Sequence, residues 1–377
     1  MKTLDKLNLS GKRVLLRVGF NSDVFKGKVI ESPRIKASVK TIKELVKKKA
    51  KVVLISHQGR PGKKDFVSLK QHAKFLNKYV KAKFVNDTIG KKAIKSIKNL
   101  KKGEVLLLEN TRFLKDEFKP SLKNKFVKNL NPLFDYYVND AFSVSHRNQT
   151  SIVSFPKVLP NGIGRVMEEE LRNIKKLKSK MKNCLFILGG RKSKDLIPLL
   201  AHKKILAGGR LSLLALISKG HKLGEENKNL RKEFSLLPSI KRHSRNIELP
   251  LDLAIEVNGK RKVLDLKDFP QNHSVLDIGD RTIEMYKKEI KKAKVIFFKG
   301  SMGVFEDKNF SKGTKEILKA ISESKTFSII AGGQSSDALK KFKINPKKFS
   351  YVSLSGGALV EYLVEGKLRG LTAQGSH

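Results

Sequence analysis

The sequence predicts an α/β protein with two domains, each of which has a mostly parallel β-sheet flanked by helices. Short apolar runs, typical of buried strands, alternate with amphipathic helical segments in both halves of the chain. With 377 residues the chain can form two hydrophobic cores. Residues 162–181 show an uninterrupted helical pattern near the middle of the chain. We therefore expect a first domain at 1–161, a connecting helix at 162–181, a second domain at 182–360 and a tail at 361–377, with a cleft between the domains.

In the first half, the strongest strand signal is Lys51–Ser56, where β-branched residues precede a glycine and a proline that end the strand. A helix is expected from Pro33, because proline suits the first helical turn and apolar residues then recur on one side. The predicted strands are Val14–Phe20, Lys51–Ser56, Phe84–Val85, Val105–Glu109 and Tyr136–Asp140. The predicted helices are Pro33–Lys49, Lys91–Leu100 and Leu122–Leu130, with another around Leu69–Val80.

The second half repeats the alternation of strands and helices. The predicted strands are Leu185–Leu188, Leu253–Val257, Val263–Leu264, Val275–Gly279, Val295–Phe298, Phe327–Ala331 and Tyr351–Leu354. The predicted helices are Leu196–Leu200, one that Gly208 and Gly209 open, one around Ile283–Ile290, Thr314–Ile321, Ser335–Phe342 and Gly356–Val364.

The chain is strongly basic, with 81 Lys and Arg against 35 Asp and Glu and a formal net charge of +46. The excess is spread over lysine-rich helical faces, aromatic residues make up 7% with no Trp, and no nucleic-acid-binding motif is present. We therefore expect no specific nucleic-acid partner, only nonspecific affinity for polyanions at low salt. A polyanion-binding protein, which would bind RNA tightly and with strong salt dependence, stays as an alternative.

The remaining composition favours a cytoplasmic protein. No segment is long and apolar enough to suggest a membrane span, and the N-terminus lacks the apolar core of a secretory signal. The single cysteine, Cys184, lies in an apolar run, which predicts a buried structural thiol and excludes an intramolecular disulfide or a CxxC metal site.

Basic residues follow the ends of four predicted strands in the first half. The carboxyl ends of parallel strands share one edge of a sheet, which is where ligands bind in open α/β sheets. Cations gathered there would repel one another unless a small, highly charged anion matched them, and arginine can hold phosphate or carboxylate through two parallel hydrogen bonds. The alternative is that they are ordinary surface cations. The residues are Arg34, His57, Arg60, Arg112 and Arg147.

The second half has glycine pairs where strands lead into helices: Gly189-Gly190, Gly208-Gly209, Gly332-Gly333 and Gly356-Gly357. Glycine lets backbone N–H groups approach a phosphate closely, and a helix N-terminus adds favourable partial charge. Four pairs at equivalent positions favour a nucleotide site, although neither a P-loop nor a GxGxxG fingerprint is present.

Two charged residues stand at loops of this second half. Lys192 follows the first glycine pair, and Glu306 follows Gly303-Val304-Phe305. A cationic site on one domain and glycine turns on the other predict phosphoryl transfer, which requires in-line geometry, charge neutralisation and exclusion of water.

A set of motifs from about Lys12 to about Gly370 resembles phosphoglycerate kinase in order and spacing. In the first half they are Arg17-Val18-Gly19-Phe20-Asn21, Pro33-Arg34-Ile35, Ser56-His57-Gln58-Gly59-Arg60-Pro61, Leu108-Glu109-Asn110-Thr111-Arg112-Phe113, Val138-Asn139-Asp140-Ala141-Phe142 and His146-Arg147. In the second half they are Gly189-Gly190-Arg191-Lys192, Asp277-Ile278-Gly279, Gly300-Ser301-Met302-Gly303-Val304-Phe305-Glu306, Lys312-Gly313-Thr314 and Ser355-Gly356-Gly357-Ala358.

The resemblance implies two Rossmann-like domains in a monomer that transfers a phosphoryl group between 1,3-bisphosphoglycerate and ADP, giving 3-phosphoglycerate and ATP with Mg²⁺. It implies that residues 1–161 bind 3-phosphoglycerate, that residues 182–360 bind the nucleotide and that the tail returns to the first domain. The substrate site implied is Asn21, Arg34, His57, Gly59, Arg60, Arg112 and Arg147. The nucleotide site implied is Lys192, Gly208, Gly209, Glu306, Gly332, Gly333, Gln334 and Ser335.

Within these sets, Arg34 and Lys192 are the catalytic candidates. The resemblance implies that Arg34 holds substrate and steadies the transferring group, and that Lys192 neutralises charge on the moving phosphoryl. Glu306 would contact the nucleotide ribose. The residues that bind the metal are left unassigned, and a water-mediated magnesium site is possible because Mg²⁺ keeps several waters.

Four positions depart from the family pattern. Gly19 stands where the family usually has Asp, and Leu196 replaces the second lysine of GGxKxxxK. Lys299-Gly300-Ser301 replaces Asn-Gly-Pro, and Gln334 replaces an acidic residue that handles magnesium. Glycerate binding is therefore expected to be nearly complete, and nucleotide and metal handling to be reduced. The alternative to an active kinase is a catalytically weakened relative that binds 3-phosphoglycerate or a similar phosphorylated acid.

Overall fold

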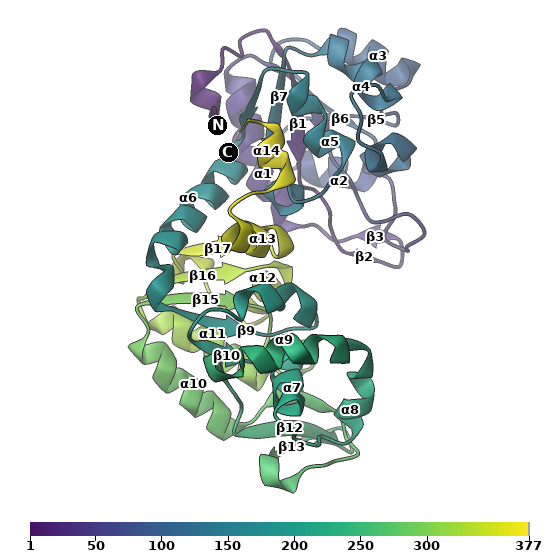
Figure 1. The fold of residues 1–377 in the computed structure, drawn as a ribbon. Helices are drawn as coiled ribbons and strands as arrows, with labels where there is room; N and C mark the ends of the chain where they lie inside the picture. The colour runs from purple at the N-terminus through teal and green to yellow at the C-terminus, as the bar shows by residue number, and fades with distance from the viewer. Residues whose placement is uncertain (376–377) are drawn as a thin grey trace. The chain divides into compact units, whose positions relative to one another are not determined.

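The computed structural model describes residues 1–375. The chain forms two compact units (Figure 1). The first unit contains Met1–Arg172 together with 365–375, and the second contains Asn173–Val364. Each unit has a six-stranded parallel sheet with flanking helices, which confirms the predicted fold class. None of the helices within 1–375 combines the length and apolarity that a bilayer span requires.

The sheet of the first unit has the strand order β5-β6-β4-β1-β7-β8. Its strands are β1 (Arg13–Val18), β4 (Lys51–Ile55), β5 (Lys83–Val85), β6 (Val105–Leu108), β7 (Tyr136–Asp140) and β8 (Asn161–Ile163). A short hairpin of β2 (Val24–Phe25) and β3 (Lys28–Val29) lies outside this sheet. Strands β4, β5 and β6 lie on one side of β1, and β7 and β8 lie on the other, so the strand order reverses between β1 and β7.

Alternate residues of β1 enter the two apolar layers of this unit. Val14 and Leu16 belong to the same buried cluster as Ile42 of α1, whereas Leu15 belongs to the cluster of Ile97 in α3. The period of two along a strand therefore covers both faces of the sheet with helices. The helices of the unit are α1 (Pro33–Lys47), α2 (Lys70–Leu76), α3 (Lys91–Lys98), α4 (Lys125–Leu130), α5 (Thr150–Val153) and α14 (Arg369–Ala373).

The helix predicted from residue 162 begins later. Residues 161–163 form β8, which pairs with β7, and α6 (Arg165–Lys180) starts two residues beyond it. Asp140, the last residue of β7, accepts hydrogen bonds from Val166 N (2.8 Å) and Met167 N (3.2 Å) and so satisfies the first N–H groups of α6. Burial raises the pKa of this Asp140 carboxyl to about 7. A three-residue strand containing glycine carries too little periodicity for the sequence to predict it.

The main sheet of the second unit has the order β11-β10-β9-β15-β16-β17. Its strands are β9 (Cys184–Leu188), β10 (Ile205–Ala207), β11 (Ile247–Glu248), β15 (Val295–Lys299), β16 (Phe327–Ala331) and β17 (Tyr351–Ser353). Here the strand order reverses between β9 and β15. Its helices are α7 (Gly209–Ser218), α8 (Glu225–Asn229), α9 (Leu237–Arg242), α10 (Asp280–Lys292), α11 (Lys312–Glu323), α12 (Gly333–Lys341) and α13 (Gly357–Glu365).

Three strands that the sequence placed in the parallel pattern form a separate antiparallel sheet. They are β12 (Asp252–Val257), β13 (Lys260–Asp265) and β14 (Val275–Ile278), in the order β13-β12-β14. The turn between β12 and β13 is Asn258-Gly259, and both residues have positive φ, at 49° and 73°. This Asn-Gly pair is a strong hairpin signal, and it explains why the two strands pair with each other.

Two further expectations differ from the structure in this unit. The segment predicted as a helix at Leu196–Leu200 is a 3₁₀ helix at Ser193–Leu199 that contains Pro198. The helices α8 and α9 were not predicted, because they are short and lie in a polar stretch without sustained apolar periodicity.

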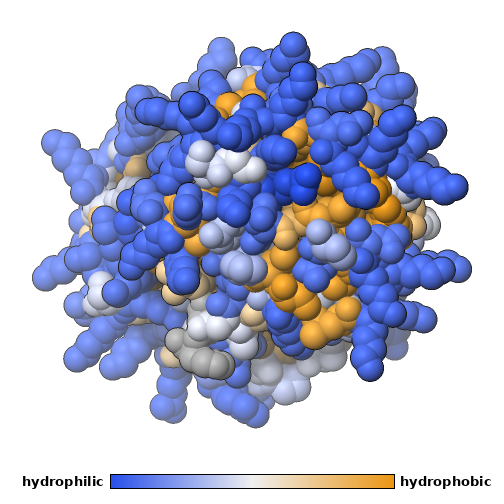
Figure 2. All heavy atoms as spheres, turned by 90° about the horizontal axis from the view of Figure 1, so that it is seen from above, coloured by the Kyte–Doolittle hydropathy of each residue, from blue (hydrophilic) through white to orange (hydrophobic). Residues whose placement is uncertain are grey.

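The basic excess lies on exposed helical faces. Along α1, for example, Lys36, Lys40, Lys43 and Lys47 recur at helical spacing and are all exposed. Figure 2 shows hydrophilic side chains projecting over most of one face, with apolar surface gathered in a smaller area. The lysines of α1 therefore form a solvated helical face, as the sequence predicts for this helix.

Candidate functional site

The carboxyl ends of β1, β4, β6 and β7 lie side by side in the first unit. The register pairs Val18 with Asp140 across β1 and β7, and Leu54 with Leu107 across β4 and β6. Of the predicted basic residues, Arg34 lies in the first turn of α1, and the others follow β4, β6 and β7 at this edge. The strand order reverses here between β1 and β7. In doubly wound sheets such an edge is the usual ligand site.

His57 is the centre of the basic cluster. It follows β4, is 3% exposed, and its Nδ1 accepts a hydrogen bond of 2.8 Å from Arg17 Nη2. Arginine can only donate, so the neutral imidazole must carry its proton on Nε2. Burial lowers the pKa of His57 well below its ordinary value, and nearby positive charge adds to the shift. The cations responsible are Arg17, Arg112, Arg34 and Arg147.

The structure therefore brings the predicted cations together. Arg60 belongs to the same group, because its charge acts on Arg112. Burial, followed by the charge of Arg17, lowers the pKa of Arg112 to about 10. Arg60 and Arg147 are exposed, whereas Arg34 and Arg112 are half-buried. Several cations held close to one another create a strong attraction for a multiply charged anion.

Hydrogen bonds between side chains and the backbone hold these residues in position. The Asn21 side-chain oxygen accepts from Gly59 N (2.9 Å), and its backbone oxygen accepts from Arg34 Nη1 (3.0 Å). Arg112 Nη1 donates to the Gly59 backbone oxygen. Gly59 has φ +66°, and a Cβ there would lie 2.1 Å from the Asp65 backbone oxygen. Only glycine fits this turn, which links the loops after β1, β4 and β6.

Beneath the cluster lies a fully buried polar relay that sequence reasoning did not assign to the site. Arg17 is 0% exposed, and its Nε donates to Ser151 Oγ (2.9 Å). Ser151 Oγ donates in turn to Glu117 Oε1 (2.7 Å), and Glu117 also accepts from Ser151 N (2.9 Å). Burial raises the pKa of Glu117 while the Arg17 charge lowers it. An arginine inside the apolar run of β1 was the available signal.

In the second unit, the predicted glycine pairs do lie between strands and helices. Two of them, however, use their N–H groups within the protein. Gly189 N donates to Lys299 O (2.9 Å) and Gly190 N to Ser301 O (2.8 Å), while Gly208 N donates to Leu188 O (2.8 Å). These turns therefore pack strand ends against one another and do not present free donors to a phosphate.

The pair Gly332-Gly333 differs at its second residue: Gly332 N donates to Ser353 O (3.0 Å), whereas Gly333 begins α12. Within residues 1–375, no acceptor is found for the N–H groups of Gly333 and Gln334, as expected at the first turn of a helix. These donors and the helix dipole make the start of α12 suitable for a phosphate. Ser335 is buried, and its hydroxyl accepts from Gly300 N (3.1 Å) and donates to Ala331 O (2.9 Å), so it supports the neighbouring turn.

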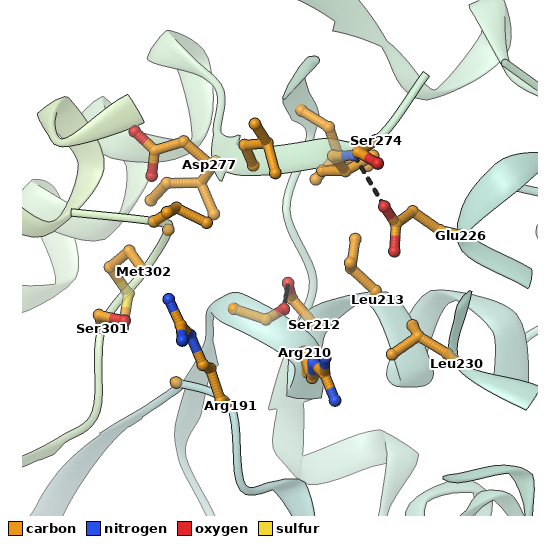
Figure 3. A pocket seen from close by; sticks show the side chains of 18 of the residues that line it. Arg191, Arg210, Ser212, Leu213, Glu226, Leu230, Ser274, Asp277, Ser301 and Met302 are labelled. Carbon is orange, nitrogen blue, oxygen red and sulfur yellow. Dashed lines mark hydrogen bonds between the residues drawn. The ribbon is translucent and has the colours of Figure 1, made fainter. Parts of the chain in front are cut away.

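A cavity of about 410 Å³ opens beside the same turns, within the size range of small-molecule sites (Figure 3). Its walls are mixed, with an apolar part that suits a flat heterocycle and polar and charged side chains around it. The apolar lining includes Leu213, Leu230, Leu253, Val275, Leu276 and Met302, and the polar lining includes Ser212, Glu226 and Asp277. Sequence reasoning did not assign these walls, because β14, α7 and α8 contribute them from distant parts of the chain.

Arg191 also lines this cavity, and Figure 3 shows its side chain extending into it. Arg191 Nη2 lies 3.5 Å from Glu306 Oε1, the carboxylate predicted to contact a ribose. Both side chains are largely exposed, so the pair contributes little to stability and can rearrange when a ligand binds.

Comparison with known proteins decides the family. A family model described as phosphoglycerate kinase matches residues 4–367. The chain belongs to the phosphoglycerate kinase family. The predicted family assignment is therefore confirmed. Like the family, the protein is a phosphotransferase that acts on phosphoglycerate and a nucleotide.

Individual relatives of the family agree over nearly the whole chain. The phosphoglycerate kinase of Sulfurisphaera tokodaii is 41% identical, over 98% of this chain and 94% of its own. That of Saccharolobus solfataricus is 40% identical, over 98% and 96%. The crystal structure of phosphoglycerate kinase from Pyrococcus horikoshii is similar with a TM-score of 0.91 and 34% identity, covering 100% of this chain and 98% of that one.

Proposed function

We propose that the first unit binds 3-phosphoglycerate or 1,3-bisphosphoglycerate and that the second binds ATP or ADP, as substrates of reversible phosphoryl transfer. The observation that carries this proposal is the gathering of four arginines around a neutral His57. The anionic phosphate and carboxylate of the glycerate match this cluster in charge. We also propose a monomer located in the cytoplasm, where the buried free Cys184 would stay reduced.

In the forward direction, an oxygen of the ADP β-phosphate attacks the phosphorus of the acyl phosphate, and the bond to the carboxyl oxygen breaks. Negative charge on the transferring group must be stabilised as this happens. Arg34, held through Asn21, and Lys192, held at the turn after β9, are the groups proposed to supply that stabilisation. His57 Nε2–H and Arg112 would fix the glycerate, and no proton transfer from the protein is needed.

For the nucleotide, the apolar part of the cavity is the proposed base site, and the start of α12 is the proposed phosphate site. Gly208 and Gly209 would form the floor between the two, and Glu306 would accept from the ribose hydroxyls after leaving Arg191. Apolar walls would thus meet the base, a carboxylate the ribose hydroxyls, and a helix N-terminus the phosphates.

Among residues 1–375, no group of three His, Cys, Asp or Glu side chains is placed to hold a metal ion. The residues present do fit Mg²⁺ that arrives on the nucleotide, because Mg²⁺ takes few protein ligands and relies on substrate phosphates. The side-chain oxygen of Gln334, which lies over the first glycine turn, is the proposed contact. The ion would neutralise phosphate charge.

Arg34→Ala should weaken 3-phosphoglycerate binding about 10- to 100-fold, since hydrogen bonds to charged groups contribute about 1.5–3 kcal/mol. The dissociation constant can be measured by titration calorimetry at fixed salt. Lys36→Ala is the matched control, because Lys36 is an exposed cation on the same helix. Equal affinities for both variants would contradict the assignment of the anion site.

Gln334→Asp should tighten binding of Mg-ADP relative to wild type and leave adenosine binding unchanged. Gln334 lies over the first glycine turn, since a Cβ built on Gly190 would be 2.9 Å from its Oε1. A carboxylate there can reach a phosphate-bound ion, for which it is a better ligand than an amide. Calorimetry with and without Mg²⁺ checks this prediction. If the metal dependence of ADP binding stayed the same, the ion would be held elsewhere.

A further inference from the structure

Lys299 is the last residue of β15, the strand at which the sheet of the second unit reverses its order. Its register partners are Leu188, the last residue of β9, and Ala331, the last residue of β16. The turn with Lys192 follows the first partner, and the open start of α12 follows the second. Lys299 thus stands between the two segments proposed to meet the nucleotide phosphates, at the position where doubly wound sheets bind ligands.

The backbone around Lys299 is held tightly. Gly189 N donates to Lys299 O (2.9 Å), and the next residue, Gly300, has φ +104°. A Cβ on Gly300 would lie 2.1 Å from the Gly189 backbone oxygen, so the two turns touch and neither can move alone. The base of the Lys299 side chain is therefore fixed relative to the turn that carries Lys192.

The charge around the Lys299 ammonium is unbalanced. It makes no hydrogen bond or ion pair with any residue in 1–375, although it is close enough to Lys192 and Asp195 for their charges to act on it. Asp195 is exposed, and Lys192 is a second cation. Two lysines that face one weak counter-charge form a site that an anion would complete.

The family pattern places its second lysine at position 196, but Leu196 is 0% exposed and belongs to the apolar interior. We propose that Lys299 is a phosphate-binding lysine of this enzyme, which acts with Lys192 on the oligophosphate of the nucleotide and supplies from β15 the cation missing at position 196. The inference rests on the proposed nucleotide site and adds a binding residue to it. It also reverses the expectation that phosphate handling is reduced in this chain.

The electrostatics around Lys299 agree with this role. Burial lowers the pKa of Lys299, Lys192 lowers it further, and Asp195 opposes the shift. A half-buried ammonium beside another cation is unfavourable until an anion binds. Nucleotide phosphates would remove that penalty, so part of the binding free energy should depend on this side chain.

The test is to measure binding of two probes, ADP and adenosine, to the full-length protein by calorimetry. Lys299→Met should weaken ADP binding at least about tenfold, a change of about 1.4 kcal/mol, and leave adenosine binding unchanged, because adenosine has no phosphate. Lys299→Arg keeps the charge and should retain most of the ADP affinity. The control is Lys294→Met, because Lys294 is an exposed lysine just before the opposite end of β15. This variant should bind both probes as wild type does.

The outcomes separate this inference from the proposal on which it rests. If wild type binds ADP no more tightly than adenosine, the nucleotide site itself is wrongly assigned. If Lys192→Ala weakens ADP binding and Lys299→Met does not, the site stands and Lys299 is not a ligand. If Lys299→Met weakens adenosine as much as ADP, its effect is structural and the inference is overturned.

Discussion

Lys192→Ala is expected to lower kcat about 100- to 1,000-fold and to change the affinity for 3-phosphoglycerate by less than about twofold. The charge that this lysine meets develops mainly as the phosphoryl group moves, so its loss should raise the barrier more than it weakens ground-state binding. A coupled assay of ATP consumption with 3-phosphoglycerate and Mg²⁺ gives kcat, with wild type expected within about 1–100 per second.

Lys194→Ala is the matched control for that experiment, because Lys194 is exposed and lies two residues further along, in the 3₁₀ helix that Lys192 precedes. It should keep wild-type turnover. If Lys192→Ala lost affinity for 3-phosphoglycerate but kept its rate, Lys192 would be a binding residue and its catalytic role would be wrong. A wild-type rate about a thousandfold below the normal kinase range would favour the weakened relative considered from the sequence.

Arg17→Met should destabilise the protein by about 3–5 kcal/mol, because it leaves Glu117 buried without a cation. Both side chains are 0% exposed, and Ser151 connects them through hydrogen bonds of 2.9 and 2.7 Å. The free energy of unfolding from urea titration measures the change. The loss should diminish as the pH falls, because protonation of Glu117 removes the unpaired charge.

Arg17→Met/Glu117→Gln should recover a substantial part of that loss, since the second change removes the unpaired charge. Arg172→Met, the same replacement at an exposed position of the first unit, should lie within about 0.5 kcal/mol of wild type. If Arg17→Met were as mild as Arg172→Met, the buried relay would not depend on its arginine.

The sheets and the edge that carries the basic cluster were predictable, because apolar runs ending in glycine or proline mark both a strand and its carboxyl end. Arg34, Arg60, Arg112 and Arg147 could be placed at this edge from the sequence. His57 could be placed there too, but the structure makes it neutral and not one of the expected cations. The role of Arg17 could not be predicted, because its apolar neighbours in the strand indicate only a buried position. Its partner Ser151 comes from α5, and only the packing of that helix brings the two together.

The nucleotide half was less predictable for a physical reason. A glycine pair shows that two backbones approach closely, but not which N–H groups remain available. Gly190 and Gly208 donate to other strands' ends, whereas Gly333 begins a helix with its donor open. Likewise, the sequence shows Lys299 only as a replacement of the family's asparagine. Its position near Lys192 depends on the pairing of β9 with β15, which the sequence does not reveal.

The fixed tautomer of His57 has a consequence for how the enzyme responds to acidification. Arg17 occupies Nδ1, and burial with the surrounding guanidinium groups keeps the ring uncharged. A phosphate monoester changes its own ionisation near pH 6. As the pH falls, the affinity for 3-phosphoglycerate should therefore follow the protonation of the ligand's own phosphate. The hydrogen-bond donors of the protein should stay the same over this range.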